Sequence, residues 1–200
     1  MTVSIMIPCH NRAENTKRLL DALIKQRKEY PQTEIIVVEN GSNEDMSFLD
    51  EYPIILDHCE KGISIARNRG LDLATGDYYC FIDNDDSIPE YYLKVVYENI
   101  VFEYDWYIWQ WWSDNTLIKM DDMDITDPLK HQWALWGYCF SKKLFDNFRF
   151  SEDDVVADRD VFRIIKKGSK GFFIKLPMYR YWWNGNEESF CHIYNANNSQ

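Results

Sequence analysis

The sequence is short of positive charge. Its 200 residues contain 22 Lys and Arg against 33 Asp and Glu, which gives a formal net charge of −11 at pH 7. No run of Lys and Arg supplies a local basic patch that would oppose this negative field. Direct binding to nucleic acid is therefore disfavoured, as is docking on an anionic lipid surface.

The sequence also lacks a long apolar segment. No stretch approaches the roughly 20 apolar residues that span a bilayer. The first residues run into an apolar segment without a charged leader and cleavage site. We therefore expect a cytoplasmic protein, with peripheral recruitment to a membrane left open.

A cysteine framework is missing too. The five cysteines are odd in number, scattered, and never spaced as a zinc or redox pair. They are Cys9, Cys59, Cys80, Cys139 and Cys191. We expect reduced thiols and a reducing compartment.

What is present indicates one domain of the α/β class. The chain is long enough to bury a sizeable core, and 46% of its residues are hydrophobic. Residues 3–7 and 34–38 have the pattern of strands buried on both faces, and a helix is predicted between them over 15–27. Strand, helix, strand is the unit of a parallel sheet, so we predict a doubly wound sheet with functional loops at the carboxyl ends of its strands.

Further elements continue the alternation. A predicted helix with Ile65, Leu71 and Leu73 on its apolar stripe ends at Gly76, a residue type favoured where a helix stops in the left-handed conformation. The other predicted elements are a helix over 44–51, strands over 54–56 and 78–82, a helix over 89–102, a strand over 104–112, a helix over 141–146 and a last strand over 171–176.

The most informative stretch is the acidic loop, residues 83–87. An apolar strand delivers Asp83, Asp85 and Asp86 within four positions. Carboxylates this close repel one another unless a cation binds between them, and hard oxygen ligands suit Mg²⁺ or Mn²⁺, which would hold the phosphates of a nucleotide. The alternative is an ordinary strand-to-helix turn, in which Asp, Asn and Ser are common.

Several polar residues follow other predicted strands and should lie at the same edge of the sheet. A nucleotide needs base contacts, ribose contacts and phosphate neutralisation in one crevice, and these loops offer each of them. The converging residues are His10, Glu39, Asn40, Asp83, Asp85 and Asp86.

Four segments, in this order and spacing, resemble family 2 glycosyltransferases with the GT-A fold. They are SIMIPCHNR at 4–12, IVVENGS at 36–42, GISIARN at 62–68 and GDYYCFIDNDD at 76–86. The resemblance implies a Rossmann-like, mostly parallel sheet with helices on both faces. It also implies transfer of a sugar from a nucleotide-sugar donor to an acceptor hydroxyl, with inversion at the anomeric carbon.

The resemblance assigns site residues. It implies a divalent cation, Mn²⁺ or Mg²⁺, at Asp83 and Asp85. It implies donor contacts by Pro8, His10, Asn11, Glu39, Asn40, Arg67, Asp83 and Asn84. The family commonly has two aspartates where this chain has Glu39 and Asn40, and an amide donates as well as accepts. Uridine is the default base, and guanine or cytosine stays open.

The second half of the chain is predicted to bind the acceptor. Residues 1–102 would be the nucleotide-sugar half and 103–200 the acceptor half of the same domain. The resemblance implies an acceptor contact at Trp136. Four further tryptophans favour core packing for their area, with a stacking platform for a sugar ring as the alternative. They are Trp106, Trp109, Trp111 and Trp112.

Inverting transfer needs a general base that removes the acceptor proton. The resemblance points to Asp158 as this base, with Asp153, Asp154 and Asp160 as alternatives. Asp158 could instead cap the helix that follows it. His192 matches a position where some related enzymes take a metal ligand.

Other functions stay open at this stage. The chain could be a nucleotide-sugar-binding module that has lost catalysis, or an enzyme acting on a modified nucleobase, a protein or a small metabolite. Synthesis of a polysaccharide or glycoconjugate is the leading interpretation.

Overall fold

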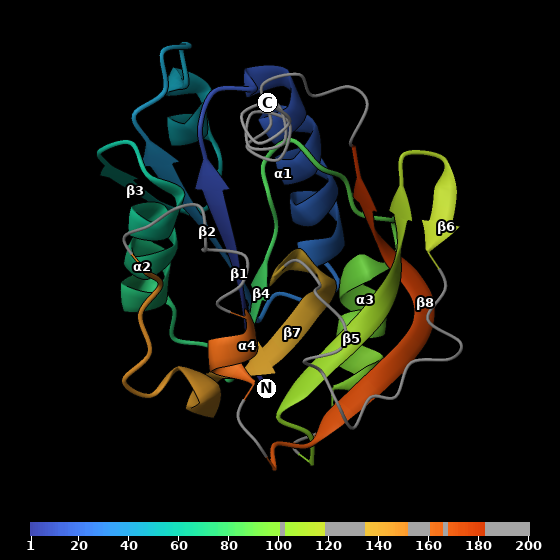
Figure 1. The fold of residues 1–200 in the computed structure, drawn as a ribbon. Helices are drawn as coiled ribbons and strands as arrows, with labels where there is room; N and C mark the ends of the chain where they lie inside the picture. The colour runs from blue at the N-terminus through green and yellow to red at the C-terminus, as the bar shows by residue number, and fades with distance from the viewer. Residues whose placement is uncertain (101–102, 119–134, 152–160, 166–167, 183–200) are drawn as a thin grey trace, which may run out of the picture.

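The described part of the chain is built on one eight-stranded sheet (Figure 1). The computed structural model describes residues 1–100, 103–118, 135–151, 161–165 and 168–182. The sheet order is β3-β2-β1-β4-β7-β5-β6, and β8 pairs with β5. The strands are β1 Val3–Cys9, β2 Thr33–Asn40, β3 Ile55–Cys59, β4 Tyr78–Phe81, β5 Trp106–Ser113, β6 Thr116–Ile118, β7 Tyr138–Ser141 and β8 Gly171–Tyr181.

The first four strands form the parallel half of the sheet. β1 lies between β2 and β4 and is parallel to both, with Ile5 opposite Ile35 and Cys80. All seven residues of β1 are buried, as expected of a strand covered on both faces. β7 is antiparallel to β4 and to β5, so it joins the parallel half to the pair of β5 and β8.

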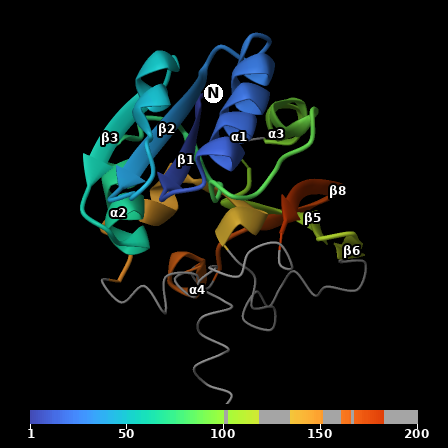
Figure 2. The same cartoon turned by 90° about the horizontal axis from the view of Figure 1, so that it is seen from above.

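Helices cover both faces of this sheet, as the sequence predicts (Figure 2). α1 Ala13–Arg27 and α3 Tyr92–Asn99 lie on one face, and α2 Ile63–Leu73 lies on the other. Short helical turns complete the fold. They are η1 Ser47–Glu51, η3 Leu135–Gly137, η4 Lys142–Phe145 and α4 Val161–Ile164. Residues 142–145, predicted as part of a helix over 141–146, thus form a 3-10 turn.

The two halves of the sheet have different cores. The core around β1 and β2 is mainly aliphatic, whereas the core around β5, β7 and β8 is aromatic. Trp106, Trp109 and Trp111 are buried, which confirms core packing for these three. Trp112 is half-buried, and the Arg180 guanidinium lies 5.3 Å from the centre of its ring.

One prediction about local structure is wrong. α2 ends at Leu73, and Gly76 does not adopt the left-handed conformation. A Cβ atom at Gly76 would lie 2.5 Å from Ser4 Oγ, so the glycine permits close approach to β1.

Residues 171–176, predicted as a strand, are the first part of β8, which continues to Tyr181. Pro177 lies at an irregularity in the pairing of β8 with β5, where a proline is tolerated.

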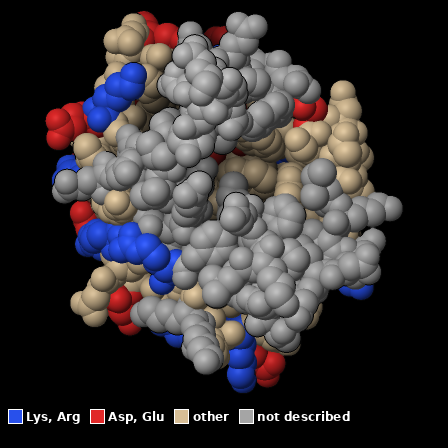
Figure 3. Space-filling model, viewed as in Figure 1, with Lys and Arg blue, Asp and Glu red and all other residues tan. Residues whose placement is uncertain are grey.

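The surface and the thiols agree with the composition. On the face shown in Figure 3, basic side chains of the described residues lie in separate groups with acidic ones between them. The four cysteines among the described residues form no disulfide. In the same part of the chain, no helix is long and apolar enough to cross a bilayer.

Candidate functional site

The loops after β1 and β2 are joined at the carboxyl edge of the sheet. His10 Nδ1 lies 3.1 Å from the Asn40 carbonyl oxygen. Asn40 Nδ2 donates to the Cys9 carbonyl oxygen at 3.0 Å, and the Gly62 N–H donates to Asn40 Oδ1 at 3.4 Å. The buried Asn40 amide therefore acts as both donor and acceptor within the chain. A carboxylate could not donate to Cys9, which gives a physical reason for asparagine at this position.

The loop after β1 is joined to the acidic loop by Asn84. Asn84 Nδ2 lies 2.9 Å from the Asn11 carbonyl oxygen and 2.8 Å from Thr16 Oγ1. Asn11 has a φ of 54°, and its Oδ1 accepts the Asn43 N–H at 2.8 Å. Both side chains thus hold loops in place. Direct contacts of Asn11, Asn40 and Asn84 with a donor stay predictions, as does the placement of buried Pro8 against a nucleoside.

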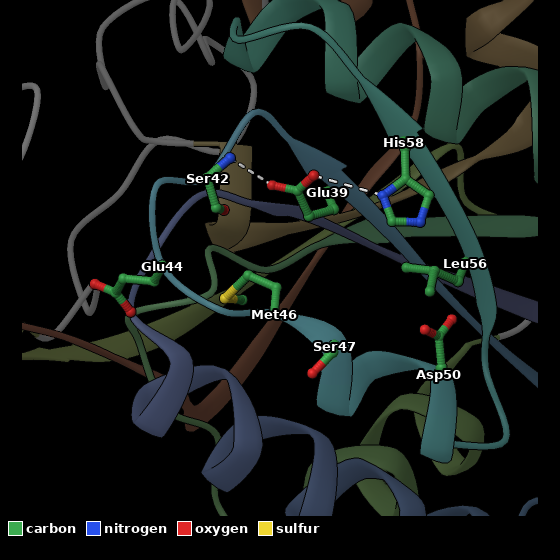
Figure 4. A pocket seen from close by; sticks show the side chains of 8 residues that line it. All are labelled: Glu39, Ser42, Glu44, Met46, Ser47, Asp50, Leu56 and His58. Carbon is green, nitrogen blue, oxygen red and sulfur yellow. Dashed lines mark hydrogen bonds and ion pairs between the residues drawn. The ribbon is translucent and has the colours of Figure 1, made fainter.

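Glu39 lines a pocket of about 220 Å³ beside the end of β2 (Figure 4). Its Oε1 accepts the Ser42 N–H at 2.6 Å, and its Oε2 lies 3.5 Å from His58 Nδ1. Partial burial would raise the pKa of Glu39, but hydrogen bonds from Ser42 and His58 outweigh that and hold the pKa below its usual value. The Glu39 carboxylate is thus ionised and accepts hydrogen bonds. The pocket is lined by Glu39, Ser42, Glu44, Met46, Ser47, Asp50, Leu56 and His58.

Arg67 of α2 reaches the acidic loop. Its side chain is 1% exposed, and its Nη2 lies 3.5 Å from Asp83 Oδ1. The guanidinium also lies 5.6 Å from the centre of the Phe150 ring, a cation–π contact. Burial against an aromatic ring and a carboxylate fixes the Arg67 guanidinium beside the acidic loop.

Asp86 has a different environment, since the end of β8 holds it. Asp86 Oδ2 accepts the Tyr179 hydroxyl at 2.8 Å, and Oδ1 accepts the Trp182 N–H at 3.0 Å. The Tyr179 hydroxyl also accepts the Asp83 N–H at 3.0 Å. Burial, with the neighbouring charges of Asp85 and Asp83, raises the pKa of Asp86 well above its usual range. Asp86 is therefore a structural residue of the loop.

Asp85 lines a second pocket, of about 390 Å³. The described residues contain no group of three or more His, Cys, Asp or Glu side chains placed to hold a metal ion by themselves. Asp83 and Asp85 nevertheless fit a hard divalent cation that completes its shell with phosphate and water oxygens, as Mg²⁺ commonly does.

Trp136, the predicted acceptor contact, belongs to an aromatic cluster. It is 7% exposed and stacks on Tyr179 with ring centres 4.5 Å apart. It also meets Trp111 edge-to-face at 5.5 Å. Its contact with an acceptor stays a prediction.

Some predicted residues lie outside the described part of the chain. They are Asp153, Asp154, Asp158, Asp160 and His192. The sequence analysis missed Tyr179 and Trp182 as partners of the acidic loop. The only available signal was their place in the last aromatic segment, which says nothing about what they contact.

Comparisons with known proteins identify the family and the fold of the chain. The sequence model of the family "Glycosyl transferase family 2" matches residues 4–163. Glycosyltransferase GlyA of Streptococcus pneumoniae is 27% identical over 179 residues, which cover 74% of this chain and 25% of GlyA. The chain therefore spans about a quarter of the length of that relative.

Solved structures show the same fold. TarS 1–349 of Staphylococcus aureus in complex with UDP-GlcNAc has a TM-score of 0.74 at 17% identity, covering 92% of this chain and 59% of that one. Mannosyltransferase PcManGT of Pyrobaculum calidifontis, in complex with GDP-Man and Mn²⁺, has a TM-score of 0.65 at 19% identity, covering 89% and 56%. The predicted α/β, GT-A-like architecture is confirmed. Because the family model matches most of the length of this chain, the chain belongs to glycosyl transferase family 2.

Proposed function

We propose that this family 2 glycosyltransferase moves a sugar from a UDP-sugar to a hydroxyl of a glycan or other acceptor, with inversion. The observation that carries the proposal is the contact between Arg67 and Asp83 at the sheet edge, with Asp85 beside it. The buried Arg67 guanidinium and the carboxylates of the acidic loop lie next to the loops that follow β1 and β2, where a nucleotide would lie.

The donor would lie across the edge of the sheet in the first half of the chain. Glu39 would accept a hydrogen bond from the base, because its carboxylate is ionised. His10, Asn11 and Asn40 would shape the nucleoside side of the crevice together with Pro8. Uridine is favoured by the TarS complexes with UDP and UDP-GlcNAc, although PcManGT with GDP-Man keeps guanine as the second candidate.

Asp83 and Asp85 would hold the divalent cation. When bound, the cation neutralises charge on the diphosphate. Arg67 keeps Asp83 oriented, and Tyr179 fixes the backbone of Asp83 from the opposite side. These contacts hold Asp83 in place before the donor binds, which reduces the ordering cost of donor binding.

The acceptor would approach from residues 103–200. An acidic residue would take the proton of the attacking hydroxyl, and Asp158 is our candidate. Trp136 and the aromatic side chains packed against it would form one side of the acceptor site. A second candidate function is a binding module without turnover. It is kept because the segment that should supply the base has no clean Glu-Asp pair.

A donor panel separates the two functions. The chain is incubated with UDP-, GDP- and CDP-sugars and Mn²⁺, and release of the nucleoside diphosphate is followed over time. An enzyme should slowly hydrolyse one donor, and chelation of the metal should stop the release. Donor binding without release would support the module, and indifference to every donor would overturn both functions.

A further inference from the structure

The pocket of about 390 Å³ beside Asp85 lies on the α1 side of the acidic loop, away from Arg67. Its size falls within the range of about 300–1,000 Å³ that is usual for small-ligand sites. Its lining combines two arginines, an amide and an indole with the loop. The lining residues are Arg12, Asn15, Arg18, Asp85, Asp86, Ser87 and Trp182.

A chain of hydrogen bonds fixes one arginine of this pocket relative to the acidic loop. Asn15 Nδ2 donates to the Asp85 carbonyl oxygen at 3.2 Å. Arg18 Nη2 donates to Asn15 Oδ1 at 3.2 Å, and Arg18 Nε donates to the Glu14 carbonyl oxygen at 3.2 Å. The guanidinium is thus held at two points, which lowers the entropy that binding an anion would cost. It stays exposed to solvent.

The other side of the pocket carries Trp182. Its backbone N–H is bound to Asp86, and its side chain is 37% exposed, among the largest exposures of a bulky apolar residue in the described part of the chain. The Arg180 guanidinium lies 5.3 Å from the centre of the Trp182 ring. The part of the indole that stays exposed offers an apolar surface beside fixed polar groups. A sugar ring has the same two characters, since its C–H groups pack on an indole while its hydroxyls reach polar side chains.

The charged side chains of the pocket narrow the class of ligand further. Two arginines, Arg12 and Arg18, line this pocket together with Asp85 and the buried Asp86. A guanidinium binds phosphate or carboxylate oxygens in a bidentate manner. Arg12 begins α1 from the left-handed conformation, with a φ of 62°, which places it at the helix start beside the loop.

We propose that this pocket binds an anionic sugar unit of the acceptor, one that carries a phosphate or a carboxylate, with Arg18 and Arg12 on the anion and Trp182 against the ring. The inference rests on the proposed function, since it takes the donor to lie on the Arg67 side of the same loop. The acceptor would then be an acidic glycan. A phosphate of the donor has the same chemistry, and the test separates the two sources.

The experiment is calorimetric titration of the full chain with glucose 1-phosphate and with glucuronate, using glucose as the neutral probe. Each titration is run without and with saturating UDP and Mn²⁺. The variant is Arg18→Ala, and the matched control is Arg27→Ala, which removes the same side chain from the far end of the same helix. Circular dichroism of both variants checks the fold.

We expect both anionic probes to bind more tightly than glucose. We expect Arg18→Ala to weaken them about tenfold or more, as for the loss of a charge-assisted hydrogen bond, and Arg27→Ala to leave them unchanged. Binding should persist when UDP and Mn²⁺ are present.

Three results would overturn the proposal. Displacement of the probes by UDP would assign the pocket to the donor phosphates, equal binding of glucose would remove the role of the anion, and equal losses in both variants would remove the role of Arg18. Failure of UDP itself to bind would count against the proposed function. The difference between the two variants would still decide whether the pocket takes anions.

Discussion

Asp83 lies beside a buried arginine on the α2 side of the acidic loop, whereas Asp86 is enclosed by the end of β8 on the other side. The Asp83 side chain is 26% exposed, while Asp86 is 5% exposed and accepts hydrogen bonds through both oxygens. Two carboxylates three positions apart therefore do different work. Asp83 is partly exposed and pairs with a buried arginine, and Asp86 fastens the loop.

The difference explains how the chain tolerates three acidic residues within four positions. The Arg67 guanidinium offsets the charge of Asp83. Burial and the charges of Asp85 and Asp83 raise the pKa of Asp86, which favours its neutral form and so lowers the repulsion. Asp85 lies between them and lines the pocket on the α1 side. The three carboxylates are thus not one ligand set, because the end of β8 occupies both oxygens of Asp86.

The largest effect should come from Asp85→Ala. If Asp85 holds the cation, donor hydrolysis should fall at least about 100-fold, because the metal supplies several kcal/mol of charge stabilisation. The melting temperature should change little, since Asp85 is not among the buried polar residues. Nucleotide release with Mn²⁺ measures the effect, with Asp72→Ala on exposed α2 surface as the control. Full activity of the Asp85 variant would end the metal role of Asp85.

The next largest effect concerns the Tyr179 hydroxyl, which tethers the acidic loop to β8. Tyr179→Phe keeps the ring stacked on Trp136 but removes the hydroxyl shared by Asp86 and the Asp83 N–H. We expect a loss of about 2–4 kcal/mol in unfolding free energy, because two partners lose a hydrogen bond. We also expect a severalfold weaker apparent affinity for Mn²⁺, because the loop is less fixed.

Urea denaturation and a manganese titration of donor hydrolysis measure the two quantities. A control that changes a tyrosine hydroxyl away from the loop is Tyr91→Phe, whose hydroxyl donates to the Pro177 carbonyl oxygen. If Tyr179→Phe loses stability with unchanged metal dependence, the tether holds the fold alone and does not position Asp83.

The comparison extends to the loop after β2, where an amide stands in place of a carboxylate. Asn40→Asp would leave the buried Cys9 carbonyl oxygen without its side-chain donor and place a charge beside it. We expect a loss of about 1–3 kcal/mol in unfolding free energy, smaller than that for Tyr179→Phe because fewer partners are affected. Thermal denaturation checks this. An unchanged stability would mean that Asn40 serves nucleotide binding and not the stability of the fold.

Much of the first half could be predicted because its signals are local. Continuous apolar runs specify β1 and β2, and the motifs place Arg67 and Asp83 at one edge. The tether could not be predicted, since Tyr179 and Asp86 are 93 residues apart and no periodicity encodes their pairing. For the same reason, the burial of Trp136 and the role of Gly76 became visible only with the fold in place.

The smallest expected effect belongs to a carboxylate far from the acidic loop. Glu34 accepts hydrogen bonds from Ser4 and from the side chain and N–H of Thr75, at the amino end of the sheet. Partial burial would raise its pKa, but these bonds outweigh that and lower the pKa from its usual value. Glu34→Gln should cost about 1 kcal/mol or less at neutral pH, discounted for solvent exposure.

The sign of its pH dependence follows from the lowered pKa. The stabilisation by Glu34 is present above the unfolded-state pKa of about 4.5 and is lost as the pH falls through the lower folded-state value. The stability gap between wild type and Glu34→Gln should therefore shrink below that pH, which urea denaturation at several pH values measures, with exposed Glu29→Gln as control. A gap that stays constant would mean that Glu34 stabilises the turn independently of its charge.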